Sequence, residues 1–167
     1  VITATFGESR WNHFHSGIDI GGGEQLITPT EQGELLYYYE EHAIPGDIPT
    51  GLGSFAAVSH GTSMVSLYCH MKKGSLDPAI ISLSADTSLG IIGDTGSSYG
   101  KHLHLSIYDL ELKKIVNPLL VLPSLTDSTP PVIKSVTLKK DSTIYNLHEG
   151  VQFSPGKYAV LIESYDP

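Results

Sequence analysis

Glycine and proline interrupt this chain so often that its regular elements must be short. Seventeen glycines and ten prolines occur among 167 residues. Between them lie short runs rich in β-branched and aromatic residues, which are typical of strands, at residues 33–40, 54–60, 63–71 and 101–109. No long amphipathic helical pattern occurs, and residues 77–86 fit either a short helix or a crossing loop. The sequence therefore predicts a mainly β protein, with a hairpin turn at "HGTS", residues 60–63.

A shift in composition divides the chain. Proline, serine and threonine gather in "VLPSLTDSTPPV", residues 121–132, as they do in linkers. Three further strand-like runs follow, at residues 132–140, 142–147 and 157–166. We predict one domain over residues 1–126 and a partial β-sandwich-like module over residues 127–167. We expect this module to be incomplete because the chain stops directly after its last strand-like run.

The charge and the apolar content exclude several kinds of partner. The formal net charge is −8 and lysine and arginine form no cluster, so neither nucleic acid nor an anionic membrane surface is an expected partner. No apolar run approaches the roughly 20 residues of a transmembrane helix. Cys69 is the single cysteine, which excludes an internal disulfide and a cysteine-rich zinc site. We expect Cys69 to be a small buried residue that strand alternation turns away from His70.

Two histidines, His102 and His104, stand one residue apart in the run at residues 101–109. In a strand they share one face, while Leu103, Leu105 and Ile107 share the other and suit a core. Such a pair is either part of a metal site or two solvated imidazoles on a strand. The motif alone does not separate these alternatives, because a chain with eight histidines produces it readily by chance.

A second pair of polar residues, His15 and Asp19, is separated by three positions and is equally weak evidence alone. In a straight strand their Cα atoms would lie about 13 Å apart, too far for two side chains that share one ion. We therefore expect the chain to bend between them, and Gly17 permits such a bend. His70 is a further candidate, at the end of the strand-like run 63–71.

Three ordered motifs together resemble the lysostaphin/LytM-type zinc metalloendopeptidases, which cut peptide bonds in bacterial peptidoglycan. The motifs are "FGESRWNHFHSGIDI" (FG and HxxxD), "SLYCHM" (family form Y-x-H-L/M) and "GDTGSSYGKHLHL" (family form GxTGxSxGxHLH), followed by "NPL", and they span about residues 6–120. The resemblance implies that His15, Asp19 and His104 bind one Zn²⁺ ion per chain. It also implies that His70 and His102 are the catalytic histidines beside the ion.

The resemblance further implies an all-β, mainly antiparallel fold with a groove over one sheet and zinc at its floor. The tail resembles the start of an immunoglobulin-like β module. The implied activity is hydrolysis of peptidoglycan stem peptides or cross-bridges by a zinc-activated water. It would take place in the bacterial cell envelope, periplasmic or extracellular, with any signal or anchor sequence outside these 167 residues. The alternative is a weak or inactive relative that binds peptidoglycan or activates a separate hydrolase, but the chain keeps all five site positions, which favours the enzyme.

Three positions depart from the family pattern. The family commonly has proline before HLH and phenylalanine–glutamate after it, whereas this chain has Lys101, Leu105 and Ser106. None of the three is an implied metal ligand, so we expect the departures to affect substrate preference and catalytic efficiency rather than zinc binding.

Overall fold

The computed structural model describes residues 1–42, 46, 48–123, 130–147 and 151–165. Contacts between residues divide the chain into two compact units, Val1–Ser124 and Leu125–Pro167. The predicted domain boundary at residue 126 lies outside the described residues. No helix in the described ranges is long and apolar enough to span a membrane.

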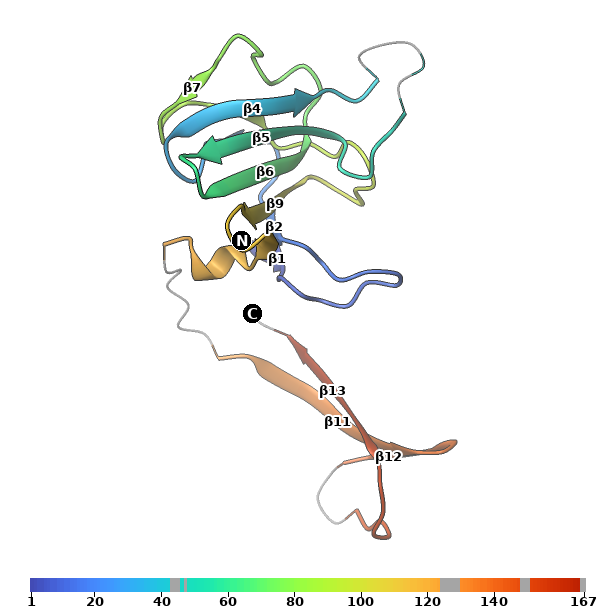
Figure 1. Cartoon of the computed structure of the whole chain (residues 1–167). Helices are drawn as coiled ribbons and strands as arrows, with labels where there is room; N and C mark the ends of the chain where they lie inside the picture. The colour runs from blue at the N-terminus through green and yellow to red at the C-terminus, as the bar shows by residue number, and fades with distance from the viewer. Residues whose placement is uncertain (43–45, 47, 124–129, 148–150, 166–167) are drawn as a thin grey trace. The chain divides into compact units, whose positions relative to one another are not determined.

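The first unit is built around one antiparallel sheet (Figure 1). Its strands lie in the order β1-β2-β9-β6-β5-β4-β7, and β10 pairs with the end of β9. Their bounds are β1 Ile2–Ala4, β2 Ile18–Gly21, β4 Gly33–Tyr39, β5 Ser54–His60, β6 Met64–Met71, β7 Ser82–Leu83, β9 His102–Asp109 and β10 Lys114–Val116. A separate two-stranded ladder joins β3 (Leu26–Ile27) to β8 (Gly90–Ile91), and a 3₁₀ helix, η1, covers Pro118–Leu120.

The long strands occur where the sequence predicts them. β4, β5, β6 and β9 match the four predicted runs to within one residue at either end. The predicted hairpin joins β5 to β6, with His60 opposite Met64. Gly61 adopts a left-handed φ of 63° in its turn, a conformation that glycine adopts without a steric penalty. Residues 77–86 contain no helix, and only Ser82–Leu83 form a strand there, so that segment is largely a crossing loop.

The two faces of the sheet differ as strand alternation predicts. Leu103, Leu105 and Ile107 are buried. The core beneath the sheet also contains Ile18, Ile27, Ala56, Val58, Tyr68, Met71, Leu83, Leu89 and Ile92. His102 and His104 therefore project from the opposite face. This face carries the polar residues of the site.

The second unit is a small three-stranded antiparallel sheet of order β12-β11-β13. Its strands are β11 Val132–Lys140, β12 Thr143–Asn146 and β13 Ala159–Tyr165, at the three predicted positions. Every strand pairing of the described residues is antiparallel, which confirms the predicted all-β, mainly antiparallel fold class.

Candidate metal centre

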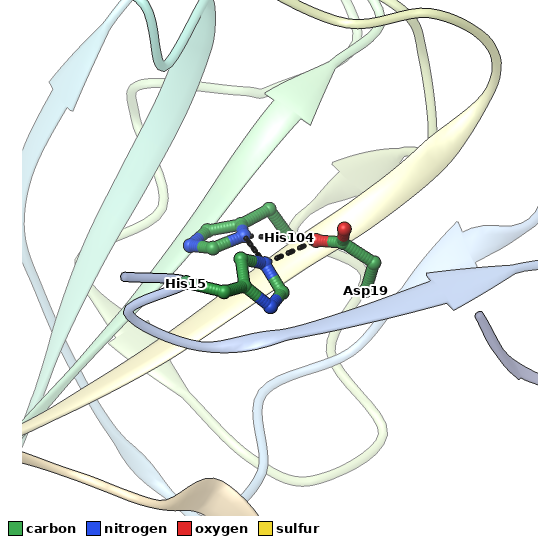
Figure 2. Close-up of side chains that lie close together, drawn as sticks. All are labelled: His15, Asp19 and His104. Atoms are coloured by element: carbon green, nitrogen blue, oxygen red, sulfur yellow. Dashed lines mark hydrogen bonds and ion pairs between the residues drawn. The ribbon is translucent and has the colours of Figure 1, made fainter. Parts of the chain in front are cut away.

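Three side chains that are distant in the sequence converge on the polar face of the sheet. His15 Nε2 lies 3.0 Å from Asp19 Oδ1 and 2.9 Å from His104 Nδ1, and His104 Nδ1 lies 2.9 Å from the same carboxylate oxygen (Figure 2). Both histidines are buried, and Asp19 is partly exposed. Within the described part of the chain, no fourth histidine, cysteine or acidic residue joins this cluster.

Strand pairing brings two of the three residues together. Asp19 on β2 lies directly opposite His104 on β9, so their side chains leave the sheet on the same face. His15 precedes β2, at the end of a hairpin-like loop that begins after β1. Backbone hydrogen bonds from Gly7 N to His15 O and from His15 N to Glu8 O, both 2.9 Å, fold this loop back onto itself.

The expected bend between His15 and Asp19 is present. Glycine is needed at position 17 because it has no side chain, and not because the backbone there is left-handed. Gly17 is absent from the residues with positive φ. A Cβ atom at this position would lie 2.2 Å from the Leu105 carbonyl oxygen and 2.8 Å from Ser106 Oγ. Glycine is thus required because the chain passes directly against β9 here, which delivers His15 to the site.

The ring protons of His15 and His104 are hydrogen-bonded to acceptors that lie outside the cluster of His15, Asp19 and His104. His15 Nδ1 lies 2.8 Å from the Thr5 carbonyl oxygen, which only accepts, so Nδ1 carries the proton. The Ser106 hydroxyl donates to the Ser16 carbonyl oxygen at 3.0 Å, so Ser106 Oγ accepts at 2.9 Å from His104 Nε2. His15 Nε2 and His104 Nδ1 therefore both present lone pairs to the Asp19 carboxylate.

These three atoms, each with a free lone pair, fit the ligand set of a metal ion. Three lone-pair atoms within 3.0 Å of one another, with no proton between them, repel each other unless a cation lies among them. Two neutral imidazole nitrogens and one carboxylate oxygen are ligands that zinc takes in catalytic sites, where three protein ligands leave one position open. The residues present therefore fit the zinc ion that the sequence implies.

Arg10 is a neighbour of the site that sequence analysis missed. Its guanidinium lies 3.5 Å from Asp19 Oδ2 and 3.5 Å from Glu8 Oε2, so it occupies the carboxylate oxygen that faces away from the two histidines. Burial acts to raise the pKa of Asp19, but the interactions with the neighbouring histidines outweigh it and hold this pKa below its ordinary value. Asp19 is accordingly a carboxylate at neutral pH.

Two further imidazoles lie beside the three converging residues. The rings of His70 and His102 are 4.8 Å apart, and the His70 ring is 6.0 Å from that of His104. His102 Nε2 lies 3.7 Å from Asp19 Oδ1. His70 Nδ1 and His102 Nδ1 donate to the carbonyl oxygens of Thr95 and Gly100, each at 2.8 Å, which leaves both Nε2 atoms as acceptors. All five residues singled out from the sequence thus lie together.

The expectation that Cys69 and His70 point to opposite faces is wrong. Cys69 lies opposite His104 in the β6–β9 ladder, so its side chain leaves the sheet on the face of the site. His70 has a left-handed φ of 60°, next to an irregularity in the β5–β6 pairing, and this turns its ring to the same face. Cys69 is 1% exposed, as expected for a small core residue. Burial, together with the charge of Asp19, raises the pKa of its thiol to about 12.

The antiparallel sheet thus carries a His-Asp-His cluster that could hold a metal ion, and comparison with known proteins gives the family. The family model of peptidase family M23 matches residues 13–118, more than half of the chain, so the chain belongs to this family. Members of the family are typically zinc-dependent endopeptidases of peptidoglycan. The comparison with curated proteins gave no match.

Several solved structures share the fold. The catalytic domain of lysostaphin from Staphylococcus simulans superposes with a TM-score of 0.58 at 16% identity, over 72% of this chain and 90% of that one. A mutant catalytic domain of the prophage-encoded M23 protein EnpA from Enterococcus faecalis gives a TM-score of 0.57 at 21% identity, over 71% of this chain and 88% of that one. A second structure of lysostaphin from Staphylococcus simulans gives a TM-score of 0.57 at 14% identity, and the match covers 99% of this chain and 76% of that one. At these identities the similarity demonstrates the fold alone.

Proposed function

We propose that this protein is a zinc-dependent endopeptidase that hydrolyses peptide cross-links of bacterial peptidoglycan in the cell envelope. One observation carries the proposal. Two imidazole lone pairs and a carboxylate converge, and two further imidazoles whose Nε2 atoms are free to accept a proton lie beside them. Membership of peptidase family M23 supports the same reaction and the same substrate class.

In this proposal His15 Nε2, Asp19 Oδ1 and His104 Nδ1 hold the zinc ion. When bound, zinc supplies Lewis acidity, which polarises a peptide carbonyl and lowers the pKa of water to about 7. The chain holds each ligand in the required orientation. Thr5 O fixes the His15 ring, Ser106 fixes the His104 ring, and Arg10 occupies Asp19 Oδ2, so that Oδ1 remains directed at the two histidines.

His70 and His102 move the protons. Burial is the main cause that lowers the pKa of His70 below its ordinary value, so its ring is neutral and Nε2 accepts at neutral pH. A neutral Nε2 takes the proton of the attacking water, and a protonated ring next to it donates to the tetrahedral oxyanion or to the departing amine.

The test joins metal analysis to digestion of purified peptidoglycan, with the products identified by mass spectrometry. Wild-type protein should bind one zinc ion per chain and release peptides, and a chelator should abolish the release. His15→Ala, Asp19→Ala and His104→Ala should each lose the metal. His70→Ala and His102→Ala should keep zinc and lose hydrolysis by about 10²-fold or more, the usual contribution of general acid–base catalysis.

Two results would count against the proposal. Full zinc occupancy in any one of the three ligand variants would remove that residue from the site. If zinc-loaded wild-type protein releases no peptide from peptidoglycans of several cross-link types, the chain is instead a binding or hydrolase-activating relative, and retained binding to intact peptidoglycan would identify it as such.

A further inference from the structure

Thr95, in the loop between β8 and β9, makes three hydrogen bonds to His70 and to the strand ends next to it. The carbonyl oxygen of Thr95 accepts from His70 Nδ1 at 2.8 Å. The hydroxyl of Thr95 donates to the Met71 carbonyl oxygen at 2.8 Å and accepts from the Ser54 backbone N–H at 2.9 Å. Ser54 begins β5 and Met71 ends β6, and both are buried. A single side chain thus connects two strand ends, while the main chain of the same residue holds the imidazole.

His70 needs such support because its backbone is unusual. A φ of 60° is uncommon in a residue other than glycine and persists only where the surrounding structure imposes it. The N–H of His70 donates to Leu52 O and its carbonyl accepts from Gly93 N, each at 2.9 Å. The Thr95 hydroxyl adds a hydrogen bond at the next carbonyl along the chain, that of Met71.

The packing around Thr95 leaves this loop little room to shift. Gly53, which has a φ of 65°, lies so close that a Cβ atom there would be 2.4 Å from Thr95 Oγ1 and 2.4 Å from its carbonyl carbon. The position of the Thr95 carbonyl is therefore set by the hydroxyl on one side and by the backbone of Gly53 on the other. Because this carbonyl accepts the ring proton of His70, its position determines which ring nitrogen faces the metal centre.

We propose that Thr95 is the positioning residue for His70: its hydroxyl anchors the carbonyl that keeps the ring proton on Nδ1 and turns Nε2 toward the metal centre. This inference rests on the function proposed above for His70. Thr95 acts through the orientation of another side chain, so its loss should change the orientation and the proton position of His70 without removing a metal ligand. Valine has nearly the same shape but neither donates nor accepts, which makes it the informative substitution.

The experiment compares zinc-loaded wild-type protein with Thr95→Val, Thr95→Ser and Thr87→Val. Thr95→Val should keep its zinc affinity within about threefold and lose about 10–100-fold in hydrolysis, mainly in kcat, as misplacement of a catalytic group does. Thr95→Ser retains the hydroxyl and should recover most of that loss. Thr87 is a matched control, because it is a partly buried threonine whose hydroxyl also accepts from a backbone N–H, that of Ser84 at 3.0 Å, in a loop away from His70. Thr87→Val should hydrolyse as wild type does.

A second readout does not depend on hydrolysis. Nitrogen NMR of labelled histidines should find the His70 ring proton on Nδ1 in the wild type and in Thr95→Ser, and a mixture of tautomers in Thr95→Val. A wild-type proton on Nε2 would overturn the proposal even if Thr95→Val fails to fold. Hydrolysis by Thr95→Val at the wild-type rate would overturn it, and so would equal losses in Thr95→Val and Thr95→Ser. If the wild type hydrolyses no peptidoglycan, the proposed function fails, whereas the tautomer comparison still tests Thr95.

Discussion

The site contains four imidazoles, those of His15, His70, His102 and His104. The ring proton of each one is hydrogen-bonded to an acceptor that is not itself a residue of the site. For His15, His70 and His102 the acceptor is a backbone carbonyl, which no substitution of a side chain removes directly. For His104 it is the hydroxyl of Ser106, whose own proton goes to the Ser16 carbonyl. His102 Nδ1 also lies 3.2 Å from the Ser98 hydroxyl, but the Gly100 carbonyl at 2.8 Å remains when that side chain is removed. His104 is therefore the imidazole whose ring-proton acceptor a point mutation can delete.

Ser106 is not a metal ligand, and its sequence position alone gives no reason to expect an effect on zinc binding, but its contact with His104 changes that expectation. Ser106→Ala should weaken zinc binding. Without the hydroxyl, His104 Nε2–H loses its partner in a buried site, and the ring is free to place its proton on Nδ1, where it blocks the metal. Loss of such an outer contact typically costs about 10–100-fold in metal affinity, and we expect that range here, measured by competition with a chromogenic chelator. Ser82→Ala, at an exposed serine on β7, is the control and should bind zinc as wild type does. Unchanged affinity in Ser106→Ala would show that the tautomer of His104 is fixed by something else.

At the scale of single elements, the long strands and their two faces could be predicted because alternation is a local property of the sequence. The position of Asp19 opposite His104 could not, since it depends on the β2–β9 register, which no local pattern specifies. The same holds for Arg10, whose contact with Asp19 depends on how the loop before β2 folds back. The left-handed backbone of His70 was missed because alternation assumes a regular strand, and an irregular pairing interrupts β6 there.

Gly17 lies directly against the backbone of β9, and Gly17→Ala should disrupt both stability and metal binding. A methyl group would meet the backbone of Leu105 at 2.2 Å, so β2 or the His15 loop must move. Overpacking of this kind costs about 1–3 kcal/mol, and we expect a loss of about 2 kcal/mol or more in the free energy of unfolding, measured by urea denaturation. Zinc affinity should fall as well, because His15 lies two residues away.

The control for this substitution is Gly51→Ala, since a Cβ atom at Gly51 meets only Ser97 Oγ, at an ordinary contact distance of 3.6 Å. Its unfolding free energy should stay within about 0.5 kcal/mol of wild type. A Gly17→Ala variant as stable as Gly51→Ala, with full zinc affinity, would mean that the chain relaxes at Gly17 without displacing His15.

At the scale of the whole molecule, the described residues of the first unit hold a hydrophobic core of their own. Its buried members all lie between Ile18 and Leu105, and the half-buried Leu119 and Leu122 pack against them from the region of η1. Pro118, the first residue of η1, is fully buried, and the Asn117 side chain caps this helix by accepting from Leu119 N at 3.1 Å. We therefore propose that residues 1–126 form a domain that folds independently of the module at residues 127–167.

Deletion of residues 129–167 should leave a monodisperse protein with a cooperative thermal transition and one bound zinc ion, measured by calorimetry and metal analysis. A longer deletion that starts at Asn117 tests the boundary from the other side. It removes buried Pro118 together with Leu119 and Leu122, and since burial of one large aliphatic side chain contributes about 1.5–3 kcal/mol, it should lower the Tm strongly or prevent folding. If the shorter deletion also aggregates or melts without cooperativity, the two units share one folding transition, and the proposed domain boundary is wrong.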